Sequence, residues 1–220
     1  ITSMYPSIIM SLNISPETKL GKLDSWDVES FLKGVDKTYS IKDQNGKESA
    51  KLTTAEFKNF LKDNNVSIST NGVLYTQDRK GLIPTLLEKW FDDRVQFRKL
   101  AKKFADSGDK EKYAYFDRRQ YIQKVVLNSL YGVLGLPVFR FYDIDNAEAT
   151  TTTGVELIKY TRSMVNHYYN SVVEDKEDYC IYIDTDSVFY SAIPIIKKKY
   201  PHIDIKDENL MTSKILEIAS

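Results

Sequence analysis

The chain has 220 residues, of which 42% are hydrophobic and 28% are charged, as in ordinary globular proteins. No stretch approaches the roughly 18 consecutive apolar residues of a membrane-spanning helix, and the single Cys180 excludes an internal disulfide and a cysteine-based zinc site. The 31 basic and 31 acidic residues balance, but residues 79–124 hold thirteen basic against seven acidic ones, a net charge of +6. That segment is either a solvated helical surface or a basic arm that faces phosphate groups.

The first 14 residues are expected to begin extended and then to become helical. Pro6 has the position of a first-turn proline, and Ile8 and Ile9 follow at helical spacing. A helix that starts at such a step leaves backbone N–H groups free at its first turn, which favours an anion there, and Tyr5 would lie beside it. An ordinary serine-capped helix start accounts for the same residues.

The next part of the chain combines turn signals with short elements. Thr53 and Glu56 have the spacing of a capping box, which predicts a short helix starting at Thr53. The pair Asn71-Gly72 predicts a tight turn before a strand over residues 73–75.

Hydrophobic periodicity then predicts two long amphipathic helices, over residues 83–105 and 110–130. Ser107-Gly108 separates them, and Gly132 is expected to end the second helix in the left-handed conformation. Two long helices joined by so short a turn pack as an antiparallel hairpin.

One face of the second helix carries four side chains with polar groups. Gln120, Lys124, Asn128 and Tyr131 recur at steps of four, four and three, so they share one side of the helix. A cation, two amides and a phenol suit the binding of a phosphate and the stacking of a base. The alternative is a solvated stripe with a capping asparagine.

The first helix of the hairpin carries two further cations on one face. Arg94 and Arg98 are four residues apart, and antiparallel packing could bring them to the same side as Lys124. Three converging cations repel one another unless a polyanion lies among them. Ion pairs with Asp92 and Asp93 are the alternative.

The remainder of the chain is expected to contain a strand over residues 137–143, a helix over 146–172, and apolar strands over 179–183 and 188–192. The last two strands are joined by a short acidic connection, which should be the only exposed part of that hairpin.

Asp184 and Asp186 stand in this connection at positions i and i+2, so they lie on one side of an extended chain. Carboxylates so close repel one another, and a hard divalent cation with oxygen ligands relieves the repulsion. A polar hairpin turn with aspartate as a turn former is the alternative.

Three motifs in this order and spacing resemble those of the family B DNA polymerases. They are SMYPSII at residues 3–9, KVVLNSLYG at 124–132 and YIDTDS at 182–187. The flanking patterns NISPET, NG-x-x-Y and FRFYD-x-x-NA are similar to those of replicative members from T-even-type bacteriophages. The resemblance covers the chain except a loosely matched stretch near 20–70 and the final twenty-odd residues.

The resemblance implies a role for each matching residue. Asp184 and Asp186 match catalytic metal ligands, with the backbone carbonyl of Ile1 as a third, for two Mg²⁺ ions. Tyr5 matches a steric gate beneath the sugar of the incoming nucleotide. The other matching residues bind the nucleotide (Ser3, Met4, Arg94, Arg98, Lys124, Asn128) or lie beside the nascent base pair (Tyr131, Gly132).

The resemblance also implies an α+β fold, a polymerase palm in which helices pack on an antiparallel sheet. The palm would comprise residues 1–75, with a variable insert near 20–70, and residues 132–220. Residues 76–131 would form a helical-hairpin fingers subdomain. The implied activity is DNA-directed DNA synthesis in viral replication, by two-metal transfer of a nucleotide to a primer 3′-hydroxyl.

We further expect a piece of a longer protein. The chain starts at Ile1, so the metal-binding aspartate of the first motif would precede it, and the family's exonuclease and thumb domains would lie outside it. Such a piece is expected to be inactive alone.

The implied partners are primer–template DNA and deoxynucleoside triphosphates. A sliding clamp and replisome proteins would join the full-length protein in the host cytoplasm, and no membrane partner is expected. Two other functions are open on the residues alone. One is a non-catalytic nucleic-acid-binding module that uses the basic hairpin, and the other is a two-metal nuclease or phosphohydrolase that uses Asp184 and Asp186.

Overall fold

The structure, a computed structural model, describes residues 3–219; Ile1, Thr2 and Ser220 lie outside the described part. The chain divides into two compact units, residues 1–154 and 155–220. None of the described helices is long and apolar enough to cross a membrane.

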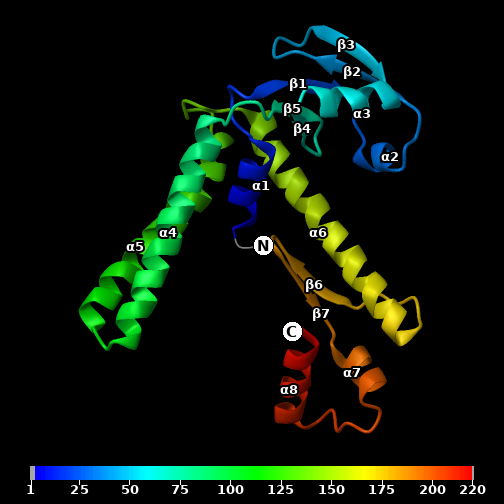
Figure 1. The fold of residues 1–220 in the computed structure, drawn as a ribbon. Helices are drawn as coiled ribbons and strands as arrows, with labels where there is room; N and C mark the ends of the chain where they lie inside the picture. Colours follow the sequence, from blue (N-terminus) through cyan, green and yellow to red (C-terminus); the bar gives the residue numbers. More distant parts are fainter. Residues whose placement is uncertain (1–2, 220) are drawn as a thin grey trace. The chain divides into compact units, whose positions relative to one another are not determined.

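The first unit contains a five-stranded antiparallel sheet (Figure 1). Its strands stand in the order β3-β2-β1-β5-β4, with the bounds β1 Lys19–Asp24, β2 Thr38–Lys42, β3 Glu48–Thr53, β4 Val66–Ile68 and β5 Val73–Thr76. The short helix α2, Val28–Leu32, lies between β1 and β2 in sequence. This sheet with its surrounding helices confirms the predicted α+β class. Strands β1 to β4 come almost entirely from the stretch near residues 20–70 that was expected to be a variable insert, and β5 is the strand predicted over residues 73–75.

Helix α3, Thr54–Asp63, packs on this sheet, and its start is as predicted. Thr53 caps the helix and Glu56 reaches back to the Thr53 backbone, which completes the capping box. The fully buried Phe57 joins a core that Leu23, Tyr39, Ile41, Val66 and Leu74 complete. Burial of this apolar surface holds helix and sheet together.

The predicted Asn71-Gly72 turn is confirmed. It joins β4 to β5, and Gly72 has a φ of +83°, in the left-handed region that glycine adopts without strain. The Ser69 backbone N–H donates to the Val73 carbonyl at 2.9 Å, which closes the connection.

Helix α1, Met4–Leu12, has Pro6 in its first turn as predicted. The expected extended segment ahead of it lies outside the described residues. Asn13 ends the helix in the left-handed conformation, and its side-chain amide donates to the carbonyls of Thr76 and Arg79 at 2.6 and 2.8 Å. Its side-chain oxygen accepts from the Gly81 backbone N–H at 2.8 Å. The end of α1 is thereby tied to Gly81, the N-cap residue of helix α4, Leu82–Asp106.

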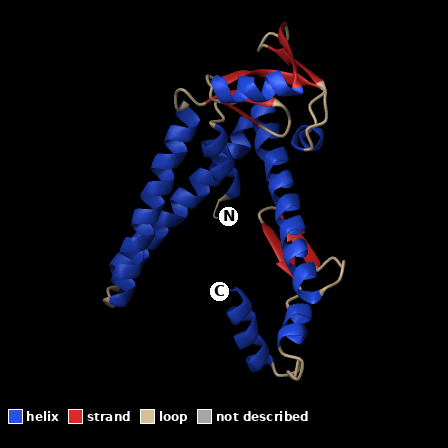
Figure 2. Cartoon of the chain, turned by 45° about the vertical axis from the view of Figure 1, so that its right-hand side comes forward, coloured by secondary structure: helices blue, strands red, loops and turns tan. Residues whose placement is uncertain are grey.

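Helices α4, Leu82–Asp106, and α5, Lys110–Leu134, form the predicted antiparallel hairpin (Figures 1 and 2). Gly108 makes the turn with a φ of +75°. The predicted end of the second helix is wrong, because α5 continues through Gly132 to Leu134 and ends at Gly135, whose φ is −88°. The fully buried Leu134 anchors this extra turn, so packing extends the helix past the glycine.

The predicted strand over residues 137–143 is also wrong, because these residues form successive turns. The Phe139 N–H donates to the Leu136 carbonyl at 2.9 Å, and the Tyr142 N–H to the Phe139 carbonyl at 3.0 Å. Val138 is 88% exposed. A β-branched and aromatic sequence forms a strand only when a neighbouring strand pairs with it, and the described residues provide none here.

Helix α6, Ile144–Val173, confirms the third predicted long helix and starts two residues before the expected position. The Asp143 side chain accepts from the Asn146 backbone N–H at 3.2 Å and so caps the first turn. The boundary between the two units falls within α6, after Gly154.

The second unit contains the hairpin β6, Cys180–Asp184, and β7, Ser187–Tyr190, followed by the helices α7, Ile193–Lys199, and α8, Glu208–Ala219. A core of Tyr169, Tyr179 and Ile195 joins the C-terminal half of α6 to these elements. The two predicted strands are confirmed, although the second ends at Tyr190.

The expectation that only the connecting turn of this hairpin is exposed is wrong. Ile181, Tyr182 and Phe189 are 70%, 57% and 55% exposed. In the described part of the chain no third strand pairs with β6 or β7, and a two-stranded sheet cannot cover both of its faces.

Candidate functional site

The first group of predicted site residues lies at the start of α1. Ser3 is the N-cap residue in a left-handed conformation, with φ and ψ of 60° and 64°. Its side chain makes no capping hydrogen bond, so the serine-capped start is not what forms. The Ser3 hydroxyl instead lies 3.4 Å from Nη1 of Arg94, which donates to it. Helix α4 thus brings a guanidinium to the first turn of α1.

Part of the Arg94 guanidinium lacks a hydrogen-bond partner among the described residues. Its Nε atom is buried and has no hydrogen-bond partner among the described residues. Burial lowers the pKa of the Arg94 guanidinium, and the positive charge of Arg98 lowers it further. A buried cationic donor without a partner is costly, and an anion that accepts its hydrogen bond would offset that cost.

Tyr5 and Tyr131 come together although 126 positions separate them in the sequence. Their ring centroids lie 4.5 Å apart with the planes tilted by 42°. Tyr5 is partly buried in the first turn of α1, and Tyr131 lies near the C-terminal end of α5. Met4, beside Tyr5, is buried and belongs to the core. One edge of the site is therefore aromatic and backed by apolar packing.

The polar face of α5 borders a surface hollow of about 320 Å³. Its lining residues are Tyr121, Lys124, Val125, Asn128 and Ser129. The hollow thus includes Lys124 and Asn128 of the predicted polar face and adds three side chains that sequence reasoning left out. Gln120 donates to Asp117 at 3.0 Å instead.

The expected alternative, in which acidic neighbours neutralise the hairpin cations, is not found. Within the described part of the chain, no acidic side chain forms an ion pair with Arg94, Arg98 or Lys124. Gly132, the remaining predicted residue of this helix, is exposed and has open space where a side chain would be.

Sequence reasoning missed Gly154, which lies in the interior of α6. A Cβ atom at this position would lie 3.2 Å from Sδ of Met4, 3.3 Å from Cε1 of Tyr5 and 3.6 Å from Cδ1 of Ile8. The absence of a side chain therefore lets α6 approach the first two turns of α1. The available signal was a glycine within an otherwise helical pattern.

A charged network near the start of α6 was also missed. The Lys19 ammonium donates to Asp143 at 2.9 Å and to Asp145 at 2.8 Å, and Lys22 donates to Asp145 at 2.7 Å. Burial would lower the pKa of Lys19, but hydrogen bonds and charges from Asp145 and Asp143 outweigh it and raise the pKa. The network joins β1 to α6.

Tyr75 reinforces this junction. Its hydroxyl donates to the side-chain oxygen of Asn146 at 2.8 Å, and both residues are fully buried. Burial is the main reason that the pKa of Tyr75 is raised, and the negative charges of Asp143 and Asp145 contribute. The phenol therefore stays protonated and keeps its donor role.

The predicted acidic pair lies in the second unit, at the β6–β7 turn. Asp184 is the last residue of β6 and pairs with Ser187, and Thr185 has a φ of +39° in the tight connection. The Thr185 hydroxyl donates to Asp184 at 3.1 Å and the Ser187 hydroxyl to Asp186 at 3.3 Å. Both carboxylates are exposed.

These carboxylates are the type of ligand that a hard divalent cation prefers, and neighbouring hydroxyls are their only polar partners among the described side chains. Within that same part of the chain, no group of three or more His, Cys, Asp or Glu side chains could hold a metal ion. The pair thus fits as part of a ligand set. The predicted third ligand, the carbonyl of Ile1, lies outside the described residues.

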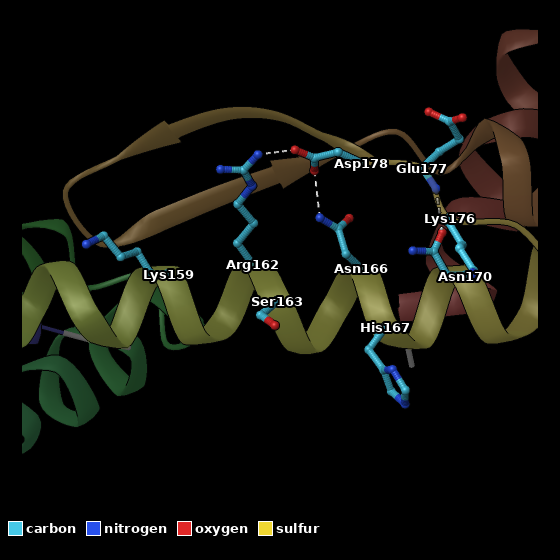
Figure 3. A pocket seen from close by; sticks show the side chains of 9 residues that line it. All are labelled: Lys159, Arg162, Ser163, Asn166, His167, Asn170, Lys176, Glu177 and Asp178. Atoms are coloured by element: carbon cyan, nitrogen blue, oxygen red, sulfur yellow. Dashed lines mark hydrogen bonds and ion pairs between the residues drawn. The ribbon is translucent and has the colours of Figure 1, made fainter. Parts of the chain in front are cut away.

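A second hollow, of about 550 Å³, lies along the C-terminal half of α6 (Figure 3). Several of its polar groups form hydrogen bonds with one another. Asp178 accepts from Arg162 and, at 2.6 Å, from Asn166, and the Arg162 hydrogen bond is the main reason that the Asp178 pKa is lowered. The Asn170 side chain accepts from the Glu177 backbone N–H at 3.1 Å. These contacts hold the segment before β6 on the helix.

Comparison with known proteins covers most of the chain. The family model for DNA polymerase family B matches residues 1–209. The DNA-directed DNA polymerase of Escherichia phage RB69 is 28% identical to the chain over 247 aligned residues, which cover 90% of the chain and 25% of the relative. That of Enterobacteria phage T4 is 27% identical with the same coverage. The expected similarity to T-even-type phage polymerases is confirmed.

A further viral polymerase matches as well. The DNA polymerase of Paramecium bursaria Chlorella virus NY2A is 31% identical, with 93% of the chain and 18% of the relative covered. The chain thus spans about a quarter or less of these relatives. Among solved structures, the family B DNA polymerase of Pyrobaculum calidifontis shares the fold, with a TM-score of 0.52 and 23% identity over 92% of the chain and 22% of that protein. The chain belongs to DNA polymerase family B.

Proposed function

We propose that this chain is part of a DNA-directed DNA polymerase that adds deoxynucleotides to a primer 3′-hydroxyl during viral DNA replication. The observation that carries the proposal is Arg94, a partly buried cation that donates to Ser3 at the start of α1 and lacks an acidic partner among the described residues. The printed names of the phage and viral relatives support the same activity.

The first unit would bind the incoming nucleotide. The cations Arg94, Arg98 and Lys124 would bind the triphosphate and offset the negative charge that moves toward the leaving group during the reaction. The backbone at Ser3 and Met4 would complete the phosphate site at the first turn of α1. Asn128 would lie beside the nucleotide.

The aromatic edge of the site would test the shape of the nucleotide and its base pair. The Tyr5 ring would lie beneath the sugar, where it leaves no room for a 2′-hydroxyl. Tyr131, whose ring contacts Tyr5, and the exposed Gly132 would lie beside the nascent base pair. The template selects the base through pairing, so these residues are proposed to recognise shape.

Asp184 and Asp186 would hold the divalent ions, two Mg²⁺, with the Ile1 carbonyl and residues outside the described part. Family B DNA polymerases generally use divalent metals, and bound ions of this kind supply Lewis acidity toward the attacking hydroxyl and the departing pyrophosphate. The role of the two aspartates is to place oxygen ligands at the tip of the β6–β7 turn.

Primer–template DNA and deoxynucleoside triphosphates are the proposed substrates. A sliding clamp and replisome proteins are proposed partners of the full-length protein. The phage relatives support action within the cytoplasm of an infected host cell.

The phosphate-binding role is tested by Lys124→Ala in the full-length protein. Loss of a charge-assisted contact costs on the order of 1.5–3 kcal/mol, or roughly one to two decades in rate. We expect weaker nucleotide binding and slower incorporation in single-turnover kinetics. Lys62→Ala, which removes an exposed lysine from α3, is the matched control. Unchanged rate and affinity in Lys124→Ala would show that Lys124 is only a surface residue.

A further inference from the structure

The interior of α6 contains a glycine where an alanine would make a more stable helix. Gly154 lies in the interior of this 30-residue helix, about a third of the way along it, and its backbone does not adopt the left-handed conformation that favours glycine. The local conformation of α6 therefore does not require glycine, and the reason for it must lie in what packs against this position.

What packs against Gly154 is the start of α1. The nearest atoms to a Cβ built at this position are the Met4 sulfur at 3.2 Å and Cε1 of the Tyr5 ring at 3.3 Å. Both distances are shorter than most contacts of real Cβ atoms, so an added methyl group must displace its neighbours by a few tenths of an ångström.

Neither neighbour can move freely. Met4 is 3% exposed, so its side chain is enclosed by the core. The Tyr5 ring already contacts Tyr131 with a centroid distance of 4.5 Å. A displacement at Gly154 is therefore transmitted to the position of the Tyr5 ring, because close-packed groups pass strain to one another.

We propose that Gly154 is a positioning residue for sugar selection, which sets how far the Tyr5 ring extends toward the incoming nucleotide. The inference rests on the proposed function, in which Tyr5 lies beneath the sugar. It adds that the selectivity depends on the contact between α6 and α1 as well as on Tyr5 itself.

The test is Gly154→Ala in the full-length protein, with kcat/KM measured separately for one deoxynucleotide and the matching ribonucleotide at one template position. We expect the preference between the two sugars to change by about threefold or more, since misplacement of a ring by a few tenths of an ångström alters a tight contact. The KM for the deoxynucleotide should rise more than kcat falls.

Two further variants separate positioning from general damage. Val155→Ala places the same residue one position further along α6, where the side chain is 52% exposed, and should leave the preference unchanged. In the Tyr5→Ala background, Gly154→Ala should also leave the preference unchanged, because the ring it displaces is gone. If Gly154→Ala fails to fold, the double variant with Met4→Val removes the sulfur 3.2 Å away and leaves the Tyr5 ring as the tight contact, so the sugar preference should still change.

Each outcome of these measurements either supports or overturns the inference. An unchanged sugar preference in Gly154→Ala, or a change that persists without the Tyr5 ring, overturns the inference while the polymerase proposal stands. If Tyr5→Ala itself leaves the preference unchanged, the role of Tyr5 in the proposed function fails first. A change in Gly154→Ala that depends on the Tyr5 ring supports the inference.

Discussion

Tyr5 combines contacts to two other helices with the sugar selection proposed for it. Its ring contacts Tyr131 on one helix and lies against Gly154 on another, so its position is set by three helices. If the ring excludes a 2′-hydroxyl, Tyr5→Ala should raise ribonucleotide incorporation far more than it lowers deoxynucleotide incorporation. The strain of an added oxygen in a close-packed site is typically about 1–3 kcal/mol. Competition between the two sugars at one template position measures this directly.

A purely structural role for Tyr5 would give a different result. Both incorporation rates would then fall together with the melting temperature, and the preference would not change. Tyr5→Phe is the matched control, because it keeps the ring and removes only the hydroxyl, so it should retain the selectivity.

The acidic pair gives a second prediction at this scale. Asp186→Asn in the full-length protein keeps the size of the side chain and removes its charge, so the proposed metal ligand is lost while binding of primer–template is largely retained. We expect primer extension to fall below about a hundredth of the wild-type rate, a loss of roughly 3 kcal/mol of transition-state stabilisation. Extension above that level would exclude the proposed role of Asp186.

At the scale of elements, the ion pairs between β1 and the start of α6 should make the free energy of unfolding depend on pH. Burial would raise the pKa of Asp145, but hydrogen bonds from Lys19 and Lys22 outweigh it and lower the pKa. Because the folded-state pKa is below the unfolded value of 3.8, the contribution of Asp145 to stability is present above that value and is lost as the pH falls through the folded pKa.

The opposite sign holds for Lys19. Its pKa is raised above 10.5, so its contribution is present below that pH and is lost as the pH rises through the folded value. Lys19→Met leaves Asp143 and Asp145 without their main partner and should lower the free energy of unfolding by about 1–3 kcal/mol at pH 7.

Urea titrations at pH 7 and at pH 3 test this prediction. The wild-type chain should lose more stability between the two pH values than Lys19→Met, because the variant has already lost the interaction that acid removes. Lys47→Met, at an exposed position between β2 and β3, is the control. Equal losses in wild type and Lys19→Met would show that this network contributes little.

At the scale of the whole molecule, the total charge is balanced, but the segment that contains most of the α4–α5 hairpin is basic. Residues 79–124 carry +6, and the remainder carries −6. Binding of duplex DNA through this segment should weaken steeply with salt, because each neutralised phosphate releases counterions. Reversal of Lys99, Lys102 and Lys110 to Glu brings the segment to zero charge and should remove most of the salt dependence.

The same reversal at Lys47, Lys51 and Lys62, which are exposed outside the hairpin, changes the total charge equally and serves as the control. Affinity measured by fluorescence anisotropy between about 50 and 200 mM salt distinguishes the two sets. Nanomolar binding that is insensitive to salt would contradict a hairpin-based phosphate contact.

Sequence alone determined the features that depend on neighbouring residues. The capping box at Thr53, the turn at Asn71-Gly72 and the helices on either side of Gly108 follow from hydrogen bonds and periodicity within one or two turns of chain. The order and spacing of the three motifs indicated the family for a similar reason, because each motif is a short contiguous run.

Tertiary structure decided what depends on distant partners. Residues 137–143 have the composition of a strand but form turns, since the described chain offers them no strand to pair with. The contact of Arg94 with Ser3 and the packing of Gly154 against Tyr5 join residues 91 and 149 positions apart. Side-chain periodicity can assign a residue to a face of its own helix, but only packing determines which other helix that face meets.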